Sequence, residues 1–122
     1  MILADTSVWV DHFRKKDAEL SRQLQHSFIL IHPFIVAELA LGNLPSRQKA
    51  LADLDLLPGC KVAQLSEVRG MIESRSLHRQ GIGLVDAHLI ASALITPNTV
   101  LWSRDKHLRS VAQSLGLDAK LP

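Results

Sequence analysis

The 122-residue sequence is poor in cysteine and in aromatic residues, and it contains no tyrosine. Its single cysteine, Cys60, excludes an internal disulfide and a cysteine-based zinc site. Phenylalanine and tryptophan together make up 4% of the chain, too few for the exposed stacking platform with which RRM and OB folds bind bases. If the protein binds nucleic acid, the binding must therefore rest on charge and shape.

Long hydrophobic runs are also missing. No apolar stretch approaches the roughly 18 residues of a membrane-spanning helix. The N-terminal segment lacks a basic region and reaches Asp5 after four apolar residues, so we expect no signal peptide and no membrane contact. We therefore expect a cytoplasmic protein. Hydrophobic residues make up 47% of the sequence, enough for the core of one domain over residues 1–122.

Short apolar segments alternate with amphipathic or apolar segments of helical length. Strands are predicted at residues 2–4, 28–31, 61–63, 99–102 and 117–121. Helices are predicted at residues 6–13, 17–26, 33–42, 45–57, 66–81, 84–95 and 103–115. This alternation predicts an α/β fold, with three layers (α/β/α) around a mainly parallel central sheet.

One carboxylate lies in an unusual place. Glu38 is surrounded by apolar residues in the segment HPFIVAELALG, and no basic or serine side chain lies one helical turn away from it. If this helix is buried, an unpaired charge there costs several kcal/mol, on the order found for desolvated carboxylates. We therefore expect Glu38 to face a polar pocket beside the core.

Three further acids fit the same pocket. The residues three and four positions before and after Asp86 in GIGLVDAHLIASAL are apolar or glycine, while Asp5 and Asp105 follow predicted strands. Ligands of parallel sheets bind beyond the carboxyl ends of strands. Each acid also has an ordinary interpretation: Asp5 as a helix cap, Asp86 and Asp105 as first-turn acids, and Glu38 as an exposed side chain.

The four acids together indicate a metal site. Converging carboxylates repel one another and raise each other's pKa, and a divalent cation removes this conflict. Ligands that are all oxygen favour Mg²⁺ or Mn²⁺. The six histidines show no zinc-binding spacing, and we expect them, with Trp9 and Trp102, to serve packing or surface roles.

Four segments of the sequence resemble the PIN-domain ribonucleases, in particular the VapC-type toxins of bacterial type II toxin–antitoxin systems. They are ILADTSVWVDHF, IHPFIVAELALG, GIGLVDAHLIASAL and LWSRDKHL. The resemblance implies an acidic quartet of Asp5, Glu38, Asp86 and Asp105, in which Asp105 is the least certain direct ligand. It also implies that Ser7 supports the first acid. Ser103 stands where the family more often has threonine.

The resemblance implies a metal-dependent endoribonuclease. Bound Mg²⁺ or Mn²⁺ would orient and acidify a water that attacks a phosphodiester, leaving 5′-phosphate and 3′-hydroxyl ends. Asp5, Glu38 and Asp86 would hold the ion directly, and Asp105 would act through water or at a second ion. The family likeness further implies a homodimer and a small VapB-type antitoxin that blocks the site.

The charge distribution is consistent with an RNA substrate. The net charge is only +2, from 14 basic and 12 acidic residues. Without the four proposed ligands, 14 bases face eight acids, a net charge of +6 that favours phosphate contacts. The RNA-binding candidates are Arg14, Lys15 and Lys16 after the first helix, and Arg104, Lys106 and Arg109 around Asp105. The alternative is that these cations only form solvated surfaces.

Two other functions compete with the ribonuclease. A phosphatase of the HAD type would also place Asp5 after the first strand, but it needs a second acid two residues later, where this chain has Ser7. A catalytically inactive PIN-fold module would bind RNA or assist assembly without cleavage. Such modules typically lack acids of the quartet, and all four are present here.

Overall fold

The computed structural model describes all 122 residues. Three short strands form the sheet: Ile2–Ala4 (β1), Ile29–Leu30 (β2) and Val100–Trp102 (β3). The helices are Thr6–Arg14 (α1), Ala18–Gln25 (α2), Pro33–Leu41 (α3), Arg47–Asp55 (α4), Leu65–Ser74 (α5), Leu84–Ile95 (α6) and Lys106–Ser114 (α7). None of the helices has the length and apolar character required to span a bilayer.

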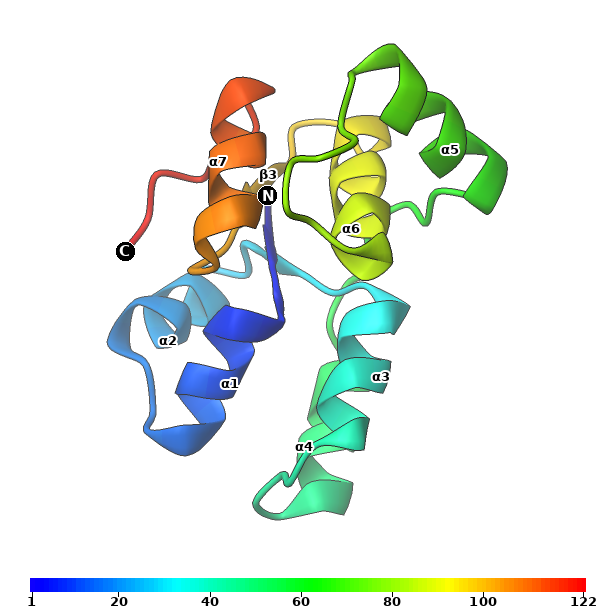
Figure 1. The fold of residues 1–122 in the computed structure, drawn as a ribbon. Coiled ribbons are helices and arrows are strands. Elements are labelled where there is room, and N and C mark those ends of the chain that lie inside the picture. The colour runs from blue at the N-terminus through cyan, green and yellow to red at the C-terminus, as the bar shows by residue number, and fades with distance from the viewer.

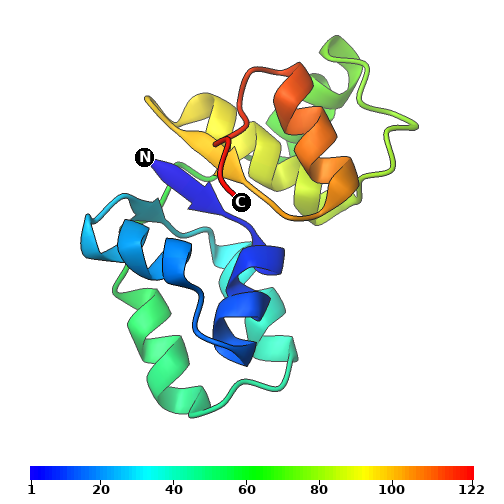
Figure 2. The ribbon, with the colours of Figure 1, turned by 90° about the vertical axis from the view of Figure 1, so that its left-hand side faces the viewer.

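The sheet has the order β2-β1-β3, and both strand pairs are parallel. Ile2 of β1 lies opposite Ile29 of β2 and Val100 of β3. Helices α1 to α4 cover one face of the sheet and α5 to α7 cover the other (Figures 1 and 2). The predicted α/β fold with three layers and a parallel sheet is therefore confirmed.

The central strand and its neighbours supply the middle of the core. Leu3, Ala4 and Leu101 are inaccessible to solvent, and Trp9 and Trp102 are 3% and 1% exposed. The predicted packing role of both tryptophans is therefore confirmed. Burial of these large side chains is the main force that holds the two helical layers on so short a sheet.

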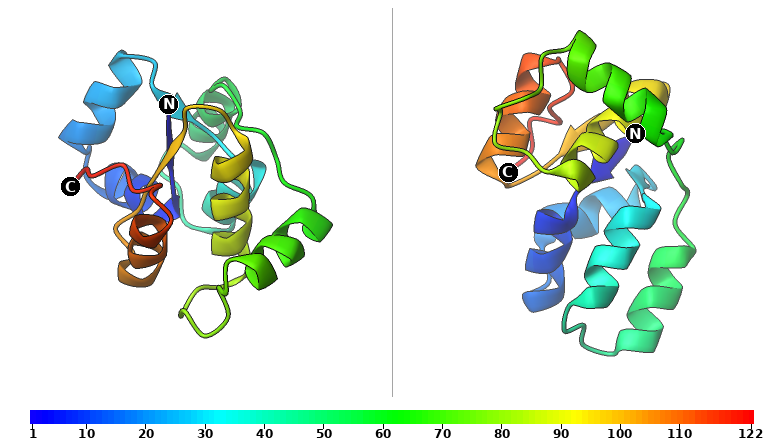
Figure 3. Two further views of the ribbon diagram at one scale, coloured as in Figure 1. Left: turned by 90° about the horizontal axis from the view of Figure 1, so that it is seen from above. Right: turned by 45° about the vertical axis from the view of Figure 1, so that its right-hand side comes forward.

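The topology opens a crevice at one edge of the sheet. Strands β1 and β3 are neighbours, but the chain leaves β1 into α1 on one face and leaves β3 into α7 on the other face (Figure 2). Such a switch point is where open parallel sheets bind ligands. Helices α3 and α4 form an antiparallel pair that extends from the sheet and borders this edge (Figure 3).

Helix α3 is fixed at its start by a buried histidine. His32 is inaccessible to solvent, and its Nδ1 accepts a hydrogen bond of 2.9 Å from the backbone nitrogen of Phe34. Its Nε2 lies 3.1 Å from the hydroxyl of Ser92 on α6. Because Nδ1 accepts, the proton of the neutral ring is on Nε2 and is donated to Ser92. Burial, together with the nearby His88, lowers the pKa of His32 to about 4.

Several predicted boundaries were wrong. Helix α5 ends at Ser74 and not near Gly81, because Ser76, Arg79 and Gly81 adopt positive φ angles that a helix cannot contain. Residues 61–63 form no strand. Just before them, Gly59 forms a single isolated β-bridge with Ile31. Residues 117–121 likewise supply one bridge, from Asp118 to Leu101, and α4 begins at Arg47 and not at Pro45.

The pKa of His32 makes the stability of the fold depend on pH. Between pH about 4 and 6.5 the folded protein binds fewer protons at His32 than the unfolded chain, so the free energy of unfolding falls as the pH drops through this window. The loss reaches about 3 kcal/mol. His32→Asn keeps a capping side chain without titrating, and urea unfolding at pH 7 and pH 4.5 should show a smaller loss for it than for the wild type. Equal losses in the two proteins would contradict this assignment.

Candidate metal and nuclease site

The four acids singled out in the sequence line one small pocket at the crevice. Its volume is about 170 Å³. Its lining residues are Asp5, Thr6, Ser7, Glu38, Asp86, Leu89 and Asp105. No lysine, arginine or histidine is among them, so no side-chain cation offsets the charge of the carboxylates within the pocket.

Asp5 is the most deeply placed of the four acids, at 4% exposed. It caps α1 by accepting hydrogen bonds from the backbone nitrogens of Ser7 (3.0 Å) and Val8 (3.4 Å). The interpretation of Asp5 as a helix cap therefore holds. Burial raises the pKa of Asp5, although hydrogen bonds from the Ser103 and Ser7 hydroxyls oppose the shift.

Two serine hydroxyls connect Asp5 to the loop between β3 and α7. Ser103 donates to Asp5 Oδ2 at 2.6 Å, and its own oxygen accepts from the backbone nitrogen of Asp105 at 3.0 Å. Ser7 donates to Asp5 Oδ1 and accepts from the backbone nitrogen of Arg104 at 2.9 Å. Both serines are placed as supports of the first acid would be.

Asp86 and Asp105 lie at the starts of helices that flank the pocket. Asp86 is half-buried in the first turn of α6, and its pKa is raised by burial and then by the charges of Asp105, Asp5 and Glu38. Asp105 caps α7 by accepting from the backbone nitrogen of Leu108 at 2.9 Å. The ordinary helix-start roles therefore hold for these acids, and they coexist with a shared pocket.

Glu38 corrects one premise of the sequence reasoning. It is exposed and not buried, because α3 is covered on one side only and also leaves Leu41 89% exposed. Its carboxylate accepts a hydrogen bond of 2.6 Å from the Thr6 hydroxyl at the start of α1. Thr6 was missed as a site residue, because the two residues lie 32 positions apart and no local pattern links them.

The pocket suits a hard divalent cation by its chemistry. All four charged groups are carboxylates, and burial, followed by the charges of Asp105, Asp5 and Glu38, raises the pKa of Asp86. Oxygen ligands of this kind favour Mg²⁺ or Mn²⁺. No three such side chains already lie close enough together to bind one ion, so binding would require the carboxylates to approach one another.

In the structure, one of the predicted RNA-binding residues is held in ion pairs, and others are exposed and unpaired. Arg104 forms ion pairs of 2.8 Å with both Asp11 and Asp17, and its guanidinium lies 5.4 Å from the centre of the Trp102 ring. It therefore fastens α1 and α2 to the loop before α7, and its charge is not free for RNA. Lys106, Arg14 and Lys15, in contrast, are exposed and form no ion pair.

Comparison with known proteins identifies a matching family and similar proteins. The family model for the PIN domain matches residues 2–114. The chain belongs to the PIN-domain family. This PIN domain is also similar to Ribonuclease VapC32 of Mycobacterium tuberculosis, from strains CDC 1551 / Oshkosh and ATCC 25618 / H37Rv. Each is 38% identical over 117 residues, which cover 96% of this chain and 94% of the relative. The resemblance to VapC-type PIN domains is confirmed.

The raised pKa of Asp86 predicts how this PIN domain responds to Mn²⁺. Because the folded state favours the neutral form, Asp86→Asn should melt at the same or a higher temperature than the wild type in EDTA. Added Mn²⁺ should raise the melting temperature of the wild type, and the variant should lose most of this increase. Asp55→Asn, an exposed acid on α4, is the matched control. An equal Mn²⁺ response of wild type and Asp86→Asn would exclude Asp86 as a ligand.

Arg104 is predicted to act on stability. Arg104→Gln removes two ion pairs around a mostly buried guanidinium and should lower the free energy of unfolding by about 1–2 kcal/mol. Asp17→Asn should cost less by itself, and the two losses should not add, because both variants break the same pair. Strictly additive losses in urea unfolding would refute this coupling.

Proposed function

We propose that this protein is a metal-dependent endoribonuclease that acts as the toxin of a toxin–antitoxin pair. The observation that carries the proposal is the convergence of Asp5, Glu38, Asp86 and Asp105 on one pocket without a compensating side-chain cation. The similarity of this chain to Ribonuclease VapC32 over nearly its whole length supports RNA as the substrate.

In this proposal the chain positions an RNA phosphate and a divalent ion. A bound Mg²⁺ or Mn²⁺ would supply charge neutralisation and acidification of a water. Asp5, Glu38 and Asp86 would hold the ion, and Asp105 would act through water or at a second ion. Ser7 and Ser103 would fix the Asp5 carboxylate by donating to its two oxygens. Thr6 would orient Glu38 through its hydroxyl.

Exposed cations beside the pocket would contribute binding to the RNA backbone. Lys106 follows Asp105 directly, and Arg14 and Lys15 end α1, which begins at the pocket. Phosphate contacts of this kind are independent of sequence and weaken with salt. We do not include Arg104 among them, because its charge is shared with Asp11 and Asp17.

The competing functions lack such support. In a phosphatase of the HAD type, position 7 would carry a second carboxylic acid, whereas Ser7 here donates a hydrogen bond to Asp5. An inactive RNA-binding or assembly module would have no need of four carboxylates that line one pocket without a compensating side-chain cation. A metal-dependent ribonuclease would use these carboxylates to hold its ion.

Further parts of the proposal concern partners. We propose a homodimer of one-domain chains spanning residues 1–122, acting in the cytoplasm and blocked by a small VapB-type antitoxin. Apolar side chains are exposed on α3 (Phe34 and Leu41) and directly after α4 (Leu56), and they are available for such protein contacts.

Incubation of purified, antitoxin-free protein with total cellular RNA tests the function. With Mg²⁺ or Mn²⁺ the wild type should give discrete fragments with 5′-phosphate and 3′-hydroxyl ends. EDTA or Asp86→Asn should lower the rate at least about 100-fold, on the scale found for removal of a key catalytic group. Asp55→Asn should cleave like the wild type. Folded wild-type protein that leaves RNA intact with both metals would favour the inactive module, and cyclic phosphate ends would contradict attack by water.

A further inference from the structure

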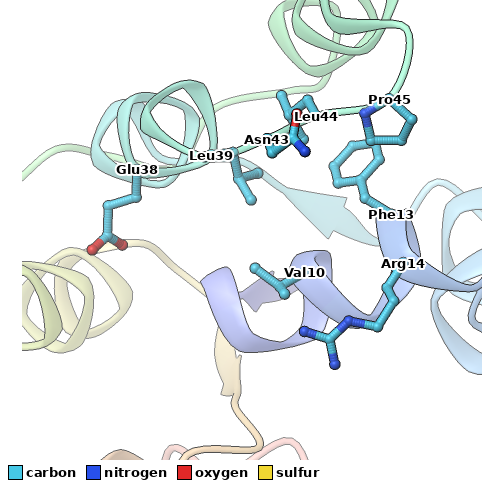
Figure 4. A pocket seen from close by; sticks show the side chains of 9 residues that line it. Val10, Phe13, Arg14, Glu38, Leu39, Asn43, Leu44 and Pro45 are labelled. Atoms are coloured by element: carbon cyan, nitrogen blue, oxygen red, sulfur yellow. The ribbon is translucent and has the colours of Figure 1, made fainter.

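A second cavity lies along α1 next to the carboxylate pocket. It is a groove of about 320 Å³ between α1 and the end of α3, and Glu38 lines both cavities. Figure 4 shows Glu38 at one end of this groove and Arg14 at the other, with Val10 and Leu39 between them. Thr6 and Arg14 are eight residues apart on α1, which corresponds to about 12 Å along the helix axis.

The groove has an apolar floor and polar groups without partners. Val10, Phe13, Leu39 and Leu44 supply the apolar surface, and Val10 is 39% exposed although it lies on a helix that packs on the core. The Arg14 guanidinium and the Asn43 side-chain amide also line the groove, and both are exposed and form no hydrogen bond. Its only acid is Glu38, at the end shared with the carboxylate pocket.

This composition matches a nucleotide in an unpaired strand. An apolar surface accepts the face of a base, an amide can donate to and accept from a base edge, and arginine binds phosphate. A strand with its scissile phosphate at the carboxylates would enter the groove directly, because Glu38 and α1 border both cavities.

We propose that the groove formed by Val10, Phe13, Leu39, Leu44, Asn43 and Arg14 is a subsite for one unpaired nucleotide of the RNA strand next to the cleaved bond. This inference rests on the proposed ribonuclease function and deepens it. It makes single-stranded RNA the preferred substrate, since a base stacked within a duplex cannot turn into the groove. Arg14 then contributes to the positioning of the strand and not only to general attraction.

Binding to a non-cleaving protein tests the subsite. Asp86→Asn is titrated with an unstructured, fluorescently labelled RNA 10-mer in Mg²⁺ at several salt concentrations. Adding Arg14→Gln should weaken binding at least about fivefold and reduce the salt slope by about one. Adding Arg69→Gln, which removes an exposed, unpaired arginine on α5, should have a much smaller effect. Val10→Glu should weaken binding strongly, whereas Val62→Glu, also at an exposed valine, should not.

Methyl NMR spectra of the same protein locate the RNA directly. On addition of the 10-mer, the methyl signals of Val10, Leu39 and Leu44 should shift, while those of Leu54 and Ile90 should stay in place. If the RNA binds with the groove signals unmoved and Arg14→Gln behaves like Arg69→Gln, the subsite is refuted and the groove is left for a protein segment.

Failure of the subsite can be told apart from failure of the ribonuclease. If the wild type cleaves RNA and the Arg14→Gln and Val10→Glu proteins cleave the 10-mer as fast as their controls, the nuclease stands and the subsite falls. If the wild type neither binds nor cleaves RNA, the ribonuclease itself falls, and the subsite with it.

Discussion

The carboxylate of Asp5 is the interaction on which the rest of the site depends. One side chain ends the central strand, caps α1 and receives hydrogen bonds from Ser7 and Ser103. Through these serines it also fixes the backbone of Arg104 and Asp105. A buried charge is tolerated only when such donors surround it. The hydrogen bonds that stabilise the buried Asp5 carboxylate thus also fix the start of α1 relative to the loop that leads into α7.

The other three acids add a conflict that the protein does not resolve by itself. Burial and the neighbouring charges raise the pKa of Asp86, and burial raises that of Asp5. In the absence of a cation these charges therefore lower the stability of the folded state at neutral pH. A bound divalent ion would offset this cost, and strain of this kind typically marks a functional site.

Local sequence patterns predicted the alternation of strands and helices, the exact span of α6 and the four acids that share the pocket. These patterns did not predict side-chain contacts between residues that are far apart in the sequence. The Thr6–Glu38 hydrogen bond and the ion pairs of Arg104 with Asp11 and Asp17 join residues far apart in the chain. The helix that carries Glu38 looked buried because its residues are apolar, and only the packing of α3 shows that one side is open, with Leu41 89% exposed. The turn after Ser74 depends on left-handed residues, two of them non-glycine, which sequence patterns predict poorly.

The central claim is that the quartet binds a divalent cation jointly. Calorimetric titration of Mn²⁺ into the metal-free protein tests it most directly. Saturable binding in the wild type that is strongly weakened in Asp5→Asn, which keeps the capping oxygen but loses the charge, is the result expected. Binding that is absent in the wild type, or unchanged in Asp5→Asn, would contradict the account.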